Sequence, residues 1–243
     1  MMILDGDWIS RHLPVGECRK SHTRYLNDFF TGKIAESVSR GELYNEDPIT
    51  GDARFCATTA SMCGIESAGF EQNEEKKKRA VRFDLMLHAY MMVQSGIPML
   101  YSGDEIGQVN DYTYKNDPEK RVDSRYIHRG KFDWKLADGR KRNGTVQKEL
   151  FDGIGKLRSI RSKEKVFDAS ANVWTLDTWE NGILGVVREL EGEQMTAFFN
   201  FAEEDRTAWI EEEGEYMDLY TGKKVSLQAI KMEGHSFVLA KKC

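Results

Sequence analysis

The stretch "IPMLYSGDEIGQ", residues 97 to 108, decides how the rest of the sequence is interpreted. It begins as an apolar run and stops abruptly at two adjacent acids, Asp104 and Glu105. Because the run is too short for a helix after Pro98, we predict a fully buried strand over residues 97 to 102. The carboxylates at its end are either part of a functional site or the polar cap of a buried strand.

A long helix is predicted immediately before this strand. Residues 71 to 95 begin with acidic side chains, which the N-terminal end of a helix dipole favours, and stop at Gly96. The second half is apolar nearly all round, as in a helix buried on most sides. A helix, a tight turn and a buried strand together indicate a parallel sheet or a (β/α) barrel.

Two further helices are expected from apolar spacing. One lies within "HTRYLNDFFTGKIAESVSRG", residues 22 to 41, and closes at Gly41. The other, within "TVQKELFDGIGKLRSIRSK", runs from residue 145 through residue 161. Between residues 104 and 144 lies a long polar segment with little periodicity, and loops of that length in a compact domain are usually functional.

The pattern changes near residue 165. From about residue 168 onward, short β-rich runs alternate with Gly, Asn and acidic turns, which predicts five or six strands in an antiparallel sandwich. We expect this region to fold independently.

The overall composition excludes several classes of protein. A net charge of -5 and a pI near 5.7 argue against a nucleic-acid or anionic-membrane partner, which would require a basic face. No apolar run approaches the length needed to span a membrane, and the N-terminal residues lack the basic start and long apolar run of a signal peptide, so we expect no signal peptide and a cytoplasmic location. The four cysteines are too sparse for a disulfide scaffold and are expected to be reduced and mostly buried. No cofactor and no metal site are expected.

The two acids have limited catalytic options. Successive strand side chains point to opposite faces, so Asp104 and Glu105 are not expected to flank one bond as acid and base. We expect one to face a site and the other to accept structural hydrogen bonds; the alternative is a polar strand cap with no substrate contact.

A second candidate site lies in "DPEKRVDSRYIHRGKFDW", residues 117 to 134. Asp123, Arg125 and His128 are interleaved there with aromatic residues. Arginine forks bind carboxylates and sugar hydroxyls, and aromatic faces stack on pyranose rings. A charged surface loop would look much the same.

Taken in order, these segments resemble the α-amylase superfamily, glycoside hydrolase family 13. The run "GIPMLYSGDEIG" resembles the superfamily's eighth barrel strand, with the pattern G-x-P-x-x-Y-x-G-x-E. Other stretches are most similar to amylosucrases, namely "YLNDFF", "YNEDPITGDAR", "NDPEKRVDSRYIHR", "LRSIR" and "DLYTGKKVSL". The resemblance implies the C-terminal part of a (β/α)₈ barrel over residues 1–165, followed by an antiparallel β-sandwich domain over residues 166–243.

The resemblance also implies roles for individual residues. Arg125 corresponds to the arginine at the floor of the glucosyl-binding subsite, with Asp123 and His128 beside it. Arg54, in "TGDAR", corresponds to a substrate-contacting arginine on the acceptor side. Asp104 and Glu105 correspond to the acidic motif that borders the site without doing the chemistry.

The sequence departs from the family in its catalytic carboxylates. The nucleophilic aspartate, the acid/base glutamate and the histidine-aspartate motif of the family have no match in this chain. Asp5 and Asp7 precede any predicted strand and are interpreted as loop residues. The sequence is therefore expected to be a C-terminal fragment, inactive alone, of a retaining enzyme that acts on sucrose or a related α-glucoside.

Two alternatives remain open. One is a non-catalytic carbohydrate-binding or structural module. The other is an unrelated small α+β protein, which is excluded if residues 97 to 102 form one strand of a parallel sheet. The expected ligand is an α-glucoside or glucan bound by the complete enzyme. Self-association is expected through the surface of residues 80 to 102 that the missing barrel strands leave uncovered.

Overall fold

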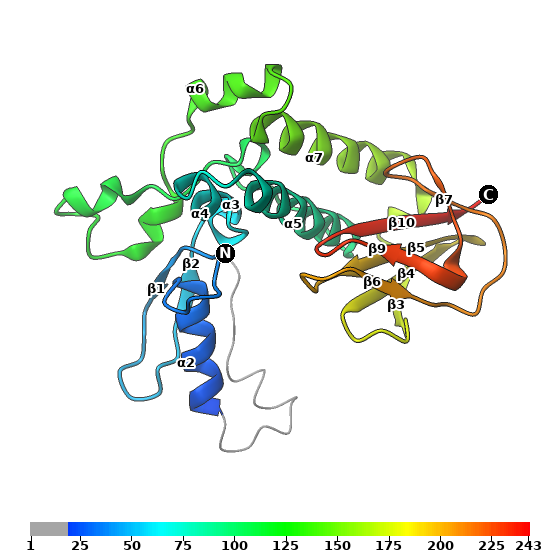
Figure 1. Cartoon of the computed structure of the whole chain (residues 1–243), viewed down its shortest axis with the longest axis horizontal. Helices are drawn as coiled ribbons and strands as arrows, with labels where there is room; N and C mark the ends of the chain where they lie inside the picture. Colours follow the sequence, from blue (N-terminus) through cyan, green and yellow to red (C-terminus); the bar gives the residue numbers. More distant parts are fainter. Residues whose placement is uncertain (1–18) are drawn as a thin grey trace. The chain divides into compact units, whose positions relative to one another are not determined.

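The computed structural model describes residues 19–243 as helices joined to antiparallel sheets (Figure 1). Asp5, Asp7 and Cys18 lie outside the described residues. The chain divides into two compact units. The first unit contains the described residues up to Val81 together with Tyr101–Gln147, and the second contains Arg82–Leu100 together with Lys148–Cys243. No described helix is long and apolar enough to cross a membrane. The cytoplasmic location stays a prediction.

The first unit consists of short elements joined by loops. Its elements are α2 (Arg19–Phe30), β1 (Glu42–Tyr44), β2 (Arg54–Cys56), α3 (Thr59–Met62), α4 (Ile65–Phe70), η2 (Asp104–Ile106), η3 (Tyr112–Asn116), η4 (Ser124–His128), α6 (Trp134–Ala137) and η5 (Asp138–Lys141). Strands β1 and β2 pair antiparallel with Tyr44 opposite Arg54. The segment predicted as a long loop is thus built mainly from 3-10 turns.

Two long helices run from one unit into the other. Helix α5 spans Glu74–Val93 and helix α7 spans Val146–Lys163. The predictions over residues 71 to 95 and 145 to 161 are confirmed, because apolar spacing and terminal signals are strong in both segments.

The helix predicted to close at Gly41 ends earlier, so that prediction is wrong. Helix α2 stops at Phe30, and Gly32 follows with a left-handed φ of +73°. The hydroxyl of Ser39 donates to the carbonyl of Phe30 over 3.1 Å, and the hydroxyl of Ser37 donates to Phe29. These serines satisfy carbonyls of the last helical turn, so the chain turns back instead of continuing as a helix.

Residues 97 to 102 are not a buried strand, contrary to the prediction. Ile97 is 88% exposed and Met99 is 78% exposed, and none of the three described sheets includes this segment. An apolar strand is buried only when neighbouring strands and helices cover it, and the described strands pair antiparallel elsewhere. The alternative of an unrelated α+β protein is therefore not excluded by this segment.

The second unit is organised around a six-stranded antiparallel sheet in the order β3-β4-β5-β10-β7-β8. A separate two-stranded sheet pairs β6 with β9. The elements are η6 (Lys165–Phe167), β3 (Asn172–Leu176), β4 (Ile183–Leu190), β5 (Glu193–Asn200), β6 (Arg206–Ala208), β7 (Tyr216–Asp218), β8 (Lys224–Val225), η7 (Leu227–Ala229), β9 (Ile230–Met232) and β10 (Phe237–Lys242). The prediction of antiparallel strands in this region is confirmed.

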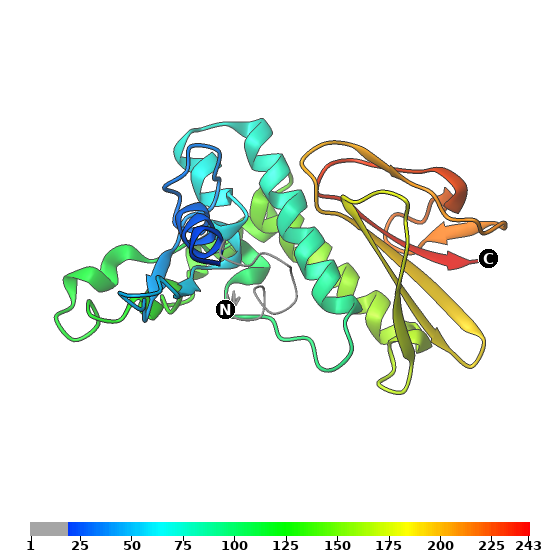
Figure 2. The same ribbon diagram turned by 90° about the horizontal axis from the view of Figure 1, so that it is seen from below.

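Both faces of the six-stranded sheet are covered. Met195, Ala197 and Phe199 alternate along β5 and pack with residues of α5 and α7. Figure 2 shows the two helices beside the sheet. Phe198, the residue between two of them, faces the opposite way and packs with residues of the β6–β9 sheet. Because helices cover one face, a sandwich of two sheets, and its boundary at residue 165, stay predictions.

A fully buried arginine joins these elements. Arg188 on β4 has no exposed surface, and its guanidinium donates to the carbonyls of Val93 (2.9 Å), Val166 (2.6 Å) and Asp168 (3.1 Å). Burial, and then the charge of Arg161, lower the pKa of Arg188. The guanidinium supplies a donor to the carbonyl of Val93, the last residue of α5, which has no acceptor role within the helix, and its positive charge is favourable at the C-terminal end of the helix dipole.

Candidate functional site

A carboxylate–arginine pair on η4 is the best-defined polar arrangement among the predicted site residues. Asp123 starts the turn by accepting the backbone N–H of Arg125 over 3.0 Å. The same carboxylate accepts Arg125 Nε at 2.9 Å through one oxygen and Arg125 Nη2 at 2.7 Å through the other. This two-point contact fixes the plane of the guanidinium, and it holds the pKa of Asp123 below its ordinary value.

The guanidinium of Arg125 also lies on an aromatic ring. Its Cζ atom is 4.3 Å from the centroid of the Tyr44 ring, which β1 supplies. The side chain remains 35% exposed, and its Nη1 donates to no other residue of the described chain. The charge is therefore positioned by Asp123 and Tyr44. Among the described residues, Nη1 has no acceptor and could donate to a ligand.

Arg54 lies next to this pair. It is the Cα partner of Tyr44 in the hairpin of β1 and β2, which Figure 1 shows. Its side chain is exposed. The structure thus gathers three predicted site residues, Arg54, Asp123 and Arg125, around Tyr44. Sequence reasoning missed Tyr44 because "YNEDPITGDAR" indicates a loop; only the register of the hairpin reveals its place.

Buried residues pack against Tyr44, the ring that lies against Arg125. Cys56, Tyr114 and Ile127 form a small core against Tyr44. Burial raises the pKa of the Cys56 thiol, which is buried as expected, like Cys63. Cys243 is exposed.

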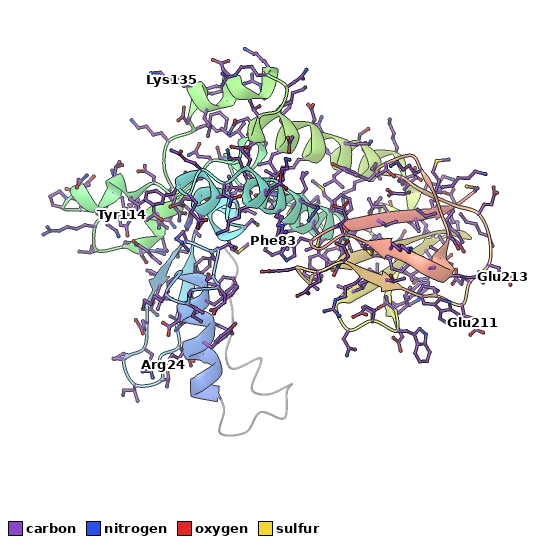
Figure 3. The ribbon with its side chains drawn as sticks, viewed as in Figure 1. Arg24, Phe83, Tyr114, Lys135, Glu211 and Glu213 are labelled. Carbon is purple, nitrogen blue, oxygen red and sulfur yellow. The ribbon has the colours of Figure 1, made fainter. Side chains whose placement is uncertain are left out.

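The carboxylate of Glu42 contacts two residues near this small core. The hydroxyl of Tyr114, which is labelled in Figure 3, donates to Glu42, and Lys115 forms an ion pair with the same carboxylate. Burial, and then this hydrogen bond, raise the pKa of Tyr114. Beside Tyr44 lies an open groove of about 690 Å³ that Lys115 and Arg121 also line.

The two acids of the opening stretch do not diverge across a strand, so that expectation is wrong. Asp104 and Glu105 occupy the 3-10 turn η2, and Gly103 before it has φ +103°. Asp104 accepts the N–H of Tyr101 over 3.0 Å, and Glu105 accepts the N–H of Gly103 over 3.1 Å. Both carboxylates therefore accept hydrogen bonds from backbone N–H groups just before their own turn.

His128 is connected to this turn rather than to Arg125. Its ring packs edge-on against the ring of Tyr101 at 5.6 Å between centroids. Burial lowers the pKa of His128, so the imidazole is neutral at neutral pH. The predicted residues therefore form two groups, one around Tyr44 and one around Tyr101.

A hydrogen-bond network that the sequence did not indicate holds the loops of this unit. Buried Asn110 accepts the N–H of Thr58 over 2.9 Å and donates to the carbonyl of Arg40 over 2.9 Å. Glu66 accepts the hydroxyls of Ser61 and Tyr112. Apart from Ser61 and Glu66, these partners lie far apart in the sequence, so no local pattern could have paired them. Within residues 19–243, no group of three or more His, Cys, Asp and Glu side chains could hold a metal ion.

Comparisons with known proteins identify solved structures that share part of this fold. No family model matches the sequence. The structure of a variant of AmyP in complex with maltotriose matches 68% of this chain and 35% of its own, with a TM-score of 0.54 and 15% identity. Trehalulose synthase MutB from Pseudomonas mesoacidophila MX-45 matches 66% of this chain and 38% of its own, with a TM-score of 0.51 and 15% identity.

These neighbours are enzymes of the α-amylase family. At such identities the likeness shows a shared fold alone. The chain spans little more than a third of the length of the structures it matches.

Proposed function

We propose that this chain forms the arginine-bearing wall of an α-glucoside-binding site in a retaining hydrolase or transglucosylase of the α-amylase superfamily, most like amylosucrase. One observation carries the proposal: Asp123 and Tyr44 hold the guanidinium of Arg125, and within residues 19–243 its Nη1 donates to no other residue. The fold shared with AmyP and trehalulose synthase MutB supports it.

In the proposed site, each residue has a limited role. Arg125 donates to hydroxyls of the glucosyl unit, and Arg54 contacts the acceptor side. Asp123 positions Arg125, since both of its oxygens already accept from that side chain. Asp104, Glu105 and His128 shape the border of the site, because the two acids accept backbone N–H groups.

The chemistry of such an enzyme requires residues that this sequence does not match. A retaining glucosidase uses a carboxylate nucleophile and a second carboxyl group about 5 Å away. In this proposal, residues 1–165 belong to a (β/α)₈ barrel, and residues 166–243 form the C-terminal sandwich domain that follows it. The catalytic carboxylates would come from other strands of the barrel.

Ligand binding tests the proposal. Isothermal titration of the purified chain with sucrose and with maltotriose should show saturable binding that Arg125→Ala weakens about tenfold, because the variant loses charged hydrogen bonds to the ligand. Arg79→Ala is the matched control, since Arg79 is exposed on α5 and belongs to neither group of site residues. Equal affinity of the two variants, or no saturable binding by the wild-type chain, would overturn the proposal.

Turnover separates this proposal from the alternative of a non-catalytic module. The wall of a catalytic site should bind the glucoside and support its turnover in the complete enzyme. Binding with no turnover in any longer protein that contains this chain would favour the non-catalytic module.

A further inference from the structure

A side-chain amide closes the open end of the hairpin of β1 and β2. Glu42 is the Cα partner of Cys56 at that end, and the same register places Arg40 opposite Thr58 two residues further out. The carboxamide of Asn110 lies between these two residues. Its Oδ1 accepts the N–H of Thr58 over 2.9 Å, and its Nδ2 donates to the carbonyl of Arg40 over 2.9 Å. The amide therefore continues the antiparallel ladder where the strands separate.

The chemistry of the carboxamide suits this place. It offers an acceptor and donors in one plane, as the backbone does, and Asn110 is only 7% exposed. An aspartate at the same position would still accept from Thr58, but it would direct a second acceptor at the carbonyl of Arg40. Asn110 is therefore required for its donor as much as for its acceptor.

Further hydrogen bonds fix the orientation of the amide. Its Nδ2 also donates to the hydroxyl of Tyr112 over 3.3 Å, and that hydroxyl donates to Glu66 over 2.7 Å. The backbone N–H of Asn110 donates to the hydroxyl of Ser61 over 2.9 Å, and Ser61 donates to the same carboxylate. These bonds form a closed ring that begins and ends at Asn110, so the amide is held in one orientation.

The hairpin is also connected to η4. The N–H of Asp111, the residue after Asn110, donates to the carbonyl of Ile127 on η4 over 2.8 Å. The hydroxyl of Ser124, the first residue of η4, donates to the carbonyl of Leu43 on β1 over 2.7 Å. The turn is thus attached to the hairpin at two places, one at the open end and one within β1.

We propose that Asn110 is a positioning residue for Arg125, whose contact with a ligand rests on the proposed function. Asn110 holds the hairpin so that Tyr44 lies against the guanidinium, with the Cζ atom 4.3 Å from the centroid of the ring. Without the donor of Asn110, the two strands spread at their open end and the contact of Tyr44 with Arg125 loosens. A ligand would then meet a guanidinium that Asp123 alone holds in place.

Nuclear magnetic resonance of the Arg125 side chain tests this position without any ligand. The ring of Tyr44 shifts the resonance of the Arg125 Nε–H group, and Tyr44→Leu gives the position of this signal without the ring. Asn110→Asp keeps the shape of the side chain but replaces its donor with an acceptor. In this variant the signal should move from its wild-type position toward its position in Tyr44→Leu.

Asn200→Asp is the matched control. Asn200 is fully buried at the end of β5, and its Nδ2 donates to the carbonyls of Glu204 (2.9 Å) and Glu233 (3.0 Å). The same substitution there should lower stability but leave the Arg125 signal at its wild-type position. A signal that stays unchanged in Asn110→Asp, or that moves equally in both variants, would overturn the inference. If Asn110→Asp does not fold, Asn110→Ser replaces it, because serine brings no charge into the buried position.

Ligand affinity shows whether the effect reaches the site. In titrations with maltotriose, Asn110→Asp should raise the dissociation constant at least about threefold, because a poorly oriented guanidinium makes weaker hydrogen bonds. It should cause no further loss in an Arg125→Ala background, since it acts through that side chain. Additive losses in the double variant would overturn the inference. A wild-type chain that binds no maltotriose would refute the proposed function, whereas the Arg125 resonance would still decide the role of Asn110.

Discussion

Replacing Arg188 with methionine should destabilise the second unit strongly. Methionine keeps much of the volume of the buried stem but has no donors. The carbonyls of Val93 and Val166, which accept from the guanidinium over 2.9 and 2.6 Å, would then lose this partner in a place that water does not reach. The carbonyl of Asp168 would lose the guanidinium as well but keep its hydrogen bond from the N–H of Ala171. The substitution thus leaves two buried carbonyls unsatisfied at the point where α5, η6 and β4 meet.

The magnitude follows from the lost hydrogen bonds to these two buried carbonyls. A hydrogen bond that involves a charged group contributes about 1.5–3 kcal/mol, and a buried unpaired acceptor costs about 1–3 kcal/mol. Removing the buried charge also removes its desolvation cost, which offsets part of the loss. We therefore expect Arg188→Met to lower the free energy of unfolding by about 3–5 kcal/mol.

Urea unfolding of the wild-type chain and two variants measures this difference. Arg206→Met is the matched control, because Arg206 pairs with Glu180 (3.0 Å) and Glu204 (3.4 Å) at a half-exposed position. Such surface pairs contribute about 1 kcal/mol or less. If Arg188→Met and Arg206→Met have the same unfolding free energy, the buried hydrogen bonds do not stabilise the fold as argued.

Three other outcomes are expected. In a complete enzyme, Arg125→Ala should lower kcat/KM at least about tenfold while leaving folding largely intact. Unchanged turnover would mean that the loop is only a surface feature. The purified chain should release no glucose from sucrose, maltose or starch, and glucose release that persists through repurification and follows the protein peak would contradict this. The hydrogen bond from Arg125 lowers the pKa of Asp123. Their pairing therefore stabilises the fold fully above about pH 4, the ordinary pKa of an aspartate. This stabilisation is lost as the pH falls through the lowered pKa of Asp123. An NMR titration should therefore show the Asp123 pKa rising in Arg125→Ala, and an unchanged midpoint would refute the pairing.

Local patterns predicted the elements whose structure depends on local signals. Helices α5 and α7 follow from apolar spacing, and the strands after residue 168 follow from alternation. The apolar run at residues 97 to 102 is different, because its pattern predicts burial but does not specify the neighbours that would bury it. The serines that end α2 are likewise tertiary partners that helical spacing does not reveal.

The candidate site shows the same limit. "DSR" indicated Asp123 and Arg125, and their contact spans only two residues. The ring of Tyr44 under Arg125 comes from a strand far earlier in the chain. Arg188 did leave a signal: it follows Val186 by two residues on β4, on the face that packs on the helices. A charge in that register indicates a buried, hydrogen-bonded side chain.

The shared core of α5 and the sheet has a consequence for synthesis on the ribosome. Val93, at the end of α5, and Arg188, which donates to it, are 95 residues apart. At 5–20 residues per second, the apolar half of α5 emerges about 5 to 20 s before the strands that cover it. During that interval Met86, Met92 and Val93 have no sheet to pack against. We therefore expect nascent chains that end before β4 to bind chaperones, and completed chains to be released from them.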